Sequence, residues 1–157
     1  MLSRYVHRSG LVLLAVLAGL LTAPQPPAEE RHVTVLAVLA TDKNKTIDHR
    51  VQGIAEEVQK LEPSLTGFRL VRTTNKPMPL GKRDTFPLVD NEVLVVQLQQ
   101  TDAKDGQDRI RLTVKAPLAG EIAYSCCTSK FFPIMTRYLT KDNERLIVAI
   151  MVKPAKK

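Results

Sequence analysis

Residues 92–115, EVLVVQLQQTDAKDGQDRIRLTVK, predict two antiparallel strands and so decide what kind of sheet to expect. Apolar residues occupy every second position at the two ends of this stretch: Leu94, Val96, Leu98, Ile110, Leu112 and Val114. Such alternation is typical of strands with one face in the core and one in water. Residues 101–108, TDAKDGQD, are polar and are expected to form the hairpin loop between them.

Two further segments are apolar without alternation. Residues 33–40, VTVLAVLA, and 145–152, RLIVAIMV, are short and rich in β-branched side chains. Runs of this kind are typical of strands that are covered on both faces. We therefore expect these two strands to lie in the middle of the sheet.

One helix is expected over residues 46–61. Its apolar residues recur at spacings of three and four and form one stripe: Val51, Ile54, Ala55, Val58 and Leu61. Thr46 or Asp48 would cap its start, and Pro63 ends it because the residue before a proline is pushed out of helical geometry. Gly53 costs helix stability, which a close approach to the sheet would explain.

Strands are also expected at residues 68–73, 85–89, 121–127 and 131–139. One helix followed by a series of strands is typical of the α+β class. We predict an α+β fold, with one N-terminal helix packed on a mainly antiparallel sheet, either sandwich-like or as a half-open barrel.

The N-terminus indicates export. Arg4 and Arg8 precede the apolar residues 11–21, small residues follow, and prolines begin at residue 24. This order is typical of a secretory signal peptide, cleaved near Ala23 or Ala28, and the apolar run is short for a spanning helix. An uncleaved N-terminal anchor is the alternative. The expected organisation is a signal peptide (1–23), a Pro-rich linker (24–32), a single domain (33–153) and a basic tail (154–157).

Charge and aromatic content limit the partners. The net charge is +7, and it falls to +5 without Arg4 and Arg8, since no acid precedes residue 24. This surplus favours an anionic surface, while an envelope protein is the other expected partner. Aromatic residues make up 4% of the chain, so specific nucleic-acid binding is not expected. The basic–aromatic stretches 130–132 (Lys130, Phe131, Phe132) and 137–138 (Arg137, Tyr138) are expected to serve in packing.

Cys126 and Cys127 are the most unusual pair in the chain. Cysteines usually pair in an exported protein, but neighbours in a strand point to opposite faces. Four interpretations remain open: two free thiols, a vicinal disulfide, a bond across a dimer, and a soft-metal or redox site. The last lacks a nearby third ligand, because the nearest histidine in sequence is His49.

Motifs for catalysis or cofactors are weak. Asp102, Asp105 and Asp108 suggest calcium, but their spacing does not fit an EF-hand, and a solvated loop is the alternative. Cys127 with His49 and Asp48 is the one nucleophile set that can be assembled. No G-x-S-x-G elbow, phosphate loop or zinc spacing is present. We expect no metal and no cofactor, and the sequence favours a protein that is not an enzyme.

Four stretches resemble a family of small exported bacterial proteins without known activity. They are residues 35–48 (VLAVLATDKNKTID), 65–74 (LTGFRLVRTT), 79–98 (PLGKRDTFPLVDNEVLVVQL) and 145–152 (RLIVAIMV). The resemblance implies an envelope or periplasmic domain and indicates no active-site residues. The paired cysteines are not part of the pattern.

The sequence thus predicts an exported cell-envelope protein that acts as a non-enzymatic binding or structural module. One alternative is a periplasmic thiol-dependent enzyme or redox protein that uses Cys126 or Cys127. The other is a binder of an anionic envelope ligand. Exposed strand edges would suit a partner strand.

Overall fold

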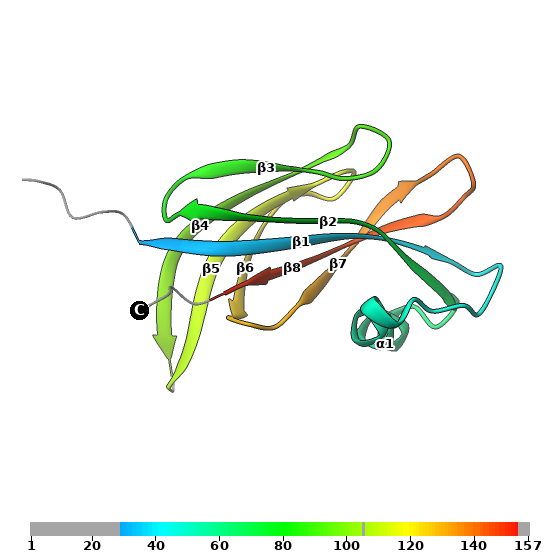
Figure 1. The fold of residues 1–157 in the computed structure, drawn as a ribbon, viewed down its shortest axis with the longest axis horizontal. Coiled ribbons are helices and arrows are strands. Elements are labelled where there is room, and N and C mark those ends of the chain that lie inside the picture. Colours follow the sequence, from blue (N-terminus) through cyan, green and yellow to red (C-terminus); the bar gives the residue numbers. More distant parts are fainter. Residues whose placement is uncertain (1–28, 105, 154–157) are drawn as a thin grey trace, which may run out of the picture.

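The fold consists of eight strands in two antiparallel sheets, as seen in a computed structural model that describes residues 29–104 and 106–153 (Figure 1). Sheet A has the order β2-β1-β8-β7 and sheet B the order β3-β4-β5-β6. The bounds are β1 (Glu30–Thr41), β2 (Gly67–Pro79), β3 (Arg83–Pro87), β4 (Val93–Lys104), β5 (Gln107–Ala116), β6 (Gly120–Cys127), β7 (Phe132–Leu139) and β8 (Arg145–Val152).

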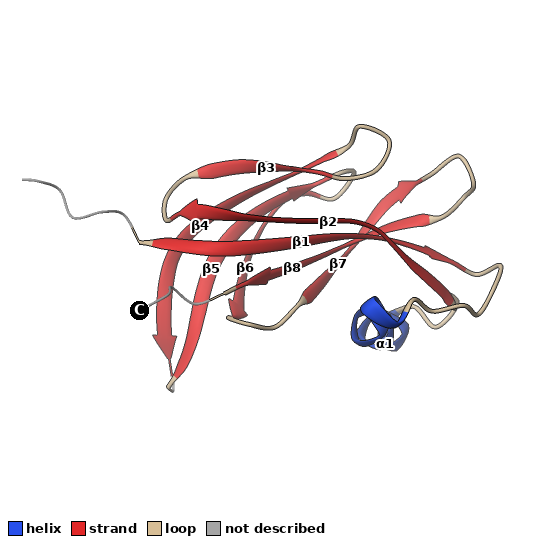
Figure 2. Ribbon diagram, in the orientation of Figure 1, coloured by secondary structure: helices blue, strands red, loops and turns tan. Residues whose placement is uncertain are grey.

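The predicted α+β class is wrong. Strands make up 61% of the described residues, whereas helix makes up 11%, in one short helical segment of 13 residues (Figure 2). The helical part consists of a 3-10 turn, η1 (His49–Val51), and the helix α1 (Gln52–Leu61). The molecule is a mostly-β sandwich, in which helix is a minor addition.

Two hydrophobic clusters hold the sandwich together. The larger lies between the sheets and includes Val35 and Leu39 of β1 and Val148 and Ile150 of β8. The smaller lies on the other face of sheet A and joins these strands to α1 residues. Successive residues of β1 and β8 therefore enter different clusters, so both strands are buried on both faces, as their sequences predict.

The helical segment begins later than predicted. Residues 46–48 are not helical, because Ile47 forms a parallel bridge with Phe68 of β2. The predicted cap at Asp48 is confirmed for η1: its Oδ1 accepts a hydrogen bond from the Arg50 N–H at 3.0 Å. The close approach expected at Gly53 is wrong, because a Cβ there would have no atom within 4 Å.

Several strands are longer than predicted. β1 begins at Glu30, so the last three residues of the predicted linker belong to the strand. β4 continues to Lys104 and β5 begins at Gln107, so most of the predicted loop 101–108 is paired backbone. The proposed signal peptide, both cleavage sites and the basic tail lie outside the described residues.

In the described part of the chain, no helix is long and apolar enough to cross a membrane.

Candidate functional site

Two adjoining clefts lie at the end of the sandwich that carries the β3–β4 and β7–β8 turns. Their volumes are about 620 and 840 Å³, and Leu39, Arg69 and Glu144 line both. The first cleft also involves the two turns, and the second involves residues 44–50 before α1. We call the two together the twin cleft.

The wall formed by residues 44–50 is held by backbone hydrogen bonds to β2. The Asp48 N–H donates to the Phe68 carbonyl, and the Phe68 N–H donates to the Thr46 carbonyl, both at 2.9 Å. Gly67 allows this close packing, because a Cβ there would collide with Asn44 Oδ1 and lie 2.9 Å from Thr41 Cγ2. Residues 44–50 are therefore fixed against β2 by backbone hydrogen bonds and close packing.

Two acids of the twin cleft are held by arginines. Arg69 donates from Nε and Nη2 to Glu144 at 2.9 and 2.5 Å, and Arg50 donates in the same way to Asp48 at 3.0 and 2.6 Å. These hydrogen bonds lower the pKa of both carboxyl groups. Both acids therefore stay ionised at neutral pH and are poor proton donors.

Apolar side chains in the twin cleft remain open to solvent. Ile47, Val71 and Val93 line it and are 36%, 41% and 47% exposed. Arg72 and Lys141 line the first cleft, and neither has a salt bridge to a described residue. Exposed apolar groups bordered by charges suit a ligand that is itself part apolar and part polar.

The cysteines lie at the end of β6 and are free thiols. Cys126 packs against the inter-sheet core, whereas Cys127 lies opposite Arg109 and donates to Gln107 Oε1 at 3.4 Å. Their side chains therefore leave opposite faces of the strand, which does not suit a vicinal disulfide. Burial raises the pKa of Cys126 to about 11, so its thiol is protonated at neutral pH and a weak nucleophile.

The structure places the two cysteines beside the basic–aromatic stretch 130–132. A cleft of about 290 Å³ is lined by both thiols, Arg109 and the stretch 130–132. Phe131 packs against the helix-side cluster and Phe132 against the inter-sheet core, where its ring lies 5.4 Å from that of Tyr124. These contacts agree with a packing role for the two phenylalanines.

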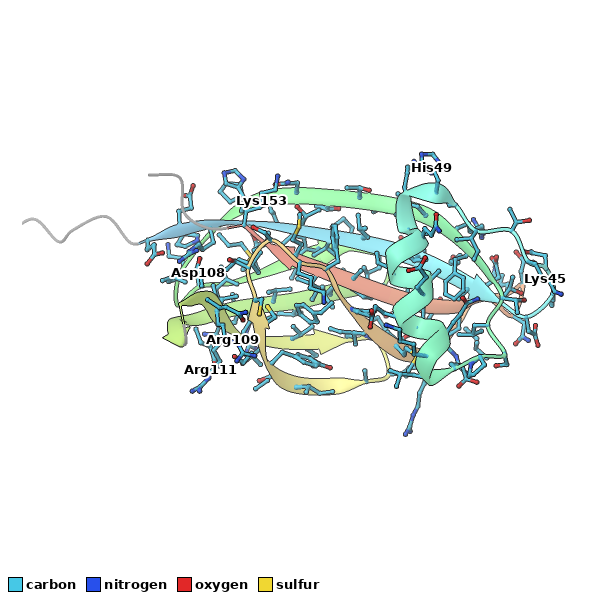
Figure 3. The ribbon with its side chains drawn as sticks, turned by 90° about the horizontal axis from the view of Figure 1, so that it is seen from below. Lys45, His49, Asp108, Arg109, Arg111 and Lys153 are labelled. Atoms are coloured by element: carbon cyan, nitrogen blue, oxygen red, sulfur yellow. The ribbon has the colours of Figure 1, made fainter. Side chains whose placement is uncertain are left out.

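The structure does not assemble the catalytic set of Cys127, His49 and Asp48. The His49 side chain is 90% exposed at the start of η1, and Figure 3 shows it far from Arg109, the cross-strand neighbour of Cys127. Asp48 is held by Arg50 instead. The one nucleophile set that the sequence allows is therefore not assembled in the fold.

The three aspartates do not form a described metal site. Asp102 lies in β4 opposite Arg109, and Asp105 falls outside the described residues. Asp108 accepts from the buried Arg31 at 2.8 Å. Among residues 29–104 and 106–153, no group of three His, Cys, Asp or Glu side chains could hold a metal ion.

The other basic–aromatic stretch also has a structural contact. The Tyr138 hydroxyl donates to Asp90 Oδ2 at 2.9 Å and so ties β7 to the β3–β4 turn, while Arg137 is exposed.

Sequence reasoning missed the twin cleft. Arg69 and Glu144 are 75 residues apart, and neither belongs to a recognisable motif. The local signal that could have indicated the second wall is the Asp48–Arg50 spacing, which allows the carboxylate to bind both the backbone and the side chain two residues later.

No protein-family model, curated protein or solved structure matches this chain.

Proposed function

We propose that this protein is an exported, non-enzymatic binding module of the cell envelope that holds an amphipathic ligand in the twin cleft. The observation that carries the proposal is the combination of exposed Val71 and Val93 with charged groups in one concave site. Such a site offers an apolar surface for one part of a ligand and hydrogen-bonding groups for another. Export rests on the basic and apolar pattern of residues 1–23.

Binding is favoured over catalysis by the state of the acids. Two of the five acids that line the twin cleft, Asp48 and Glu144, are held ionised by arginines, and its one histidine is almost fully exposed. General acid–base chemistry at neutral pH needs a group whose pKa lies near the working pH. The protonated Cys126 thiol argues in the same way against Cys126 as the nucleophile of the thiol-dependent alternative.

Two fluorescent probes test the proposal. N-phenyl-1-naphthylamine is uncharged, and 1-anilino-8-naphthalenesulfonate carries one sulfonate beside a similar ring system. We expect both to bind the exported protein with one site per chain. Val93→Glu should weaken the binding of both probes about tenfold or more, because it places a charge where the naphthalene ring of the probe would lie.

The matched control is Leu118→Glu. Leu118 is 68% exposed and lies outside the twin cleft, so its replacement should leave probe binding unchanged. Equal effects of the two variants, or no saturable binding by either probe, would refute the proposal. Circular dichroism of each variant verifies that the fold is kept.

A further inference from the structure

The free edge of β6 differs from the other three sheet edges in the described part of the chain. An edge strand offers unpaired N–H and C=O groups, and proteins block such edges with prolines, charges, bulges or short strands. β6 carries one charged residue, Glu121, no proline, and an unbroken register with β5 over all eight residues. Its first four residues and Ser125 are exposed.

The other edges carry the usual protection. β2 contains two prolines, three basic residues and a register shift against β1. β3 is five residues long, with Arg83, Asp84 and a terminal proline. β7 contains Pro133, and its register with β8 is interrupted after Met135. Among the sheet edges formed by residues 29–104 and 106–153, β6 alone is left open to another strand, at the border of sheet B (Figure 1).

We propose that the β6 edge is a homodimer interface, at which β6 of a second copy pairs antiparallel about a two-fold axis at Ala123. With the axis at Ala123, Glu121 lies opposite the partner's Ser125, and Ile122 lies opposite the partner's Tyr124. The side chains of two residues that lie directly opposite each other in an antiparallel pair are on the same face of the sheet. The half-exposed Ile122 and the partly buried Tyr124 thereby extend the apolar side of sheet B into the second copy.

Charge complementarity favours a second copy as the occupant. Within one chain, Ser125 lies opposite Arg111 of β5. The partner's Glu121 would therefore face Arg111 across the small Ser125 side chain, and the two-fold axis repeats this ion pair. Arg111 is exposed, points away from the sandwich and has no salt bridge to a described residue (Figure 3). Within its own chain, Glu121 lies opposite Lys115 of β5 and contacts Arg83 at a long 3.5 Å.

Disulfide trapping tests both the interface and its register. In a Cys126→Ala/Cys127→Ala background, Ala123→Cys should form an intermolecular disulfide on mild oxidation, because residue 123 meets its own copy at the axis. Ser125→Cys, two residues along the same face, should not, since it meets Glu121. A dimer band for Ala123→Cys but not for Ser125→Cys supports the proposal, whereas no band, or equal bands, overturns it.

Charge reversal tests the ion pair without cysteines. Sedimentation equilibrium of the exported protein should show a monomer–dimer equilibrium. Glu121→Lys and Arg111→Glu should each weaken dimerisation about tenfold, because each places like charges across Ser125. The double variant should restore the dimer affinity. Glu56→Lys, an equal charge change on α1, is the control. A protein that stays monomeric at millimolar concentration, or a double variant without rescue, would overturn the proposal.

Discussion

At the scale of single residues, the two glycines beside the twin cleft wall have opposite roles. Gly67 is required because a side chain there would displace Asn44, whose Oδ1 also accepts from the Thr46 N–H at 3.0 Å. Gly53 lies in the first turn of α1 with open space around it. The same residue type is therefore a packing requirement at one position and a source of unnecessary backbone entropy at the other.

Gly53→Ala should raise the free energy of unfolding by about 0.5–1 kcal/mol. Alanine is the better helix former and restricts the unfolded chain, and the added methyl meets no atom. Urea denaturation monitored by circular dichroism measures the effect. Gly67→Ala is the informative contrast, because it should lower stability; the reverse order would show that the wall around Asn44 is not packed as described.

Glu144→Gln should destabilise the protein at pH 7 by up to about 1 kcal/mol, a small effect because half of the Arg69 side chain is exposed. Arg69 lowers the pKa of Glu144 in the folded state, so the unfolded chain binds the proton more tightly. The stabilisation is therefore complete above the unfolded pKa of about 4.3 and is lost as the pH falls through the lower folded value.

Denaturation of both proteins from pH 7 down to pH 2 measures this difference. Glu30→Gln, an exposed carboxylate without a salt bridge in the described structure, is the control and should show little effect at any pH. A Glu144→Gln penalty that does not shrink in acid would mean that the carboxylate is not the stabilising group.

At the scale of elements, a buried arginine connects the two sheets. Arg31 of β1 is 5% exposed and binds Asp108 of β5 at 2.8 Å and Glu29 at 2.6 Å. Burial opposes its charge while the two acids favour it, and the pKa of Arg31 is raised overall. Its Nε is buried without a hydrogen-bond partner in the described structure, so the desolvation of the guanidinium is not fully compensated.

Asp108→Ala should cost more stability than Arg31→Met. The first change leaves a buried guanidinium with one acid and should cost about 2–3 kcal/mol, whereas methionine fills similar space without a charge and should cost less than about 1 kcal/mol. Chemical denaturation of the two variants gives both values. A larger loss for Arg31→Met would show that the ion pair itself stabilises the contact between the sheets.

The accuracy of sequence prediction also varied by element. The bounds of β8 agree with residues 145–152, because seven apolar residues follow Arg145 directly after a polar turn. The loop 101–108 was wrong because antiparallel backbone pairing extends through polar residues that leave no periodic signal. The helix start was wrong because the Ile47–Phe68 bridge, a tertiary contact, holds residues 46–48 in a non-helical conformation.

These local errors explain why the fold class was wrong. Residues 74–79, which contain Pro77 and Pro79, lie beyond the strand expected at 68–73, and they continue β2 as an edge strand beside β1. This extension and the longer β4–β5 hairpin add strand residues that the sequence did not indicate. The result is two sheets, where one sheet covered by a helix was expected. The twin cleft could not be predicted, because it depends on which turns meet at one end of the sandwich.

At the scale of the whole molecule, both hydrophobic clusters depend on the same two strands. Successive residues of β8 belong to different clusters. Leu146 and Val148 face the sandwich core, whereas Ile147 and Ala149 face α1. A change in β8 therefore affects both clusters at once. Because neither cluster has a complete wall without β1 and β8, we expect the described domain to unfold as one cooperative unit.

Amide hydrogen exchange with mass spectrometry measures this coupling. Amides of β1 and β8 should exchange only through global unfolding, with a protection free energy equal to that from denaturant, while those of the β3–β4 turn should exchange faster. Ile147→Ala empties space on the helix side and should cost about 2–5 kcal/mol. That loss should lower the protection of β4 and β5 by the same amount, although these strands do not contact the mutated side. If β4 and β5 kept their protection while α1 lost it, the two clusters would be independent, and sheet B would carry its own stability.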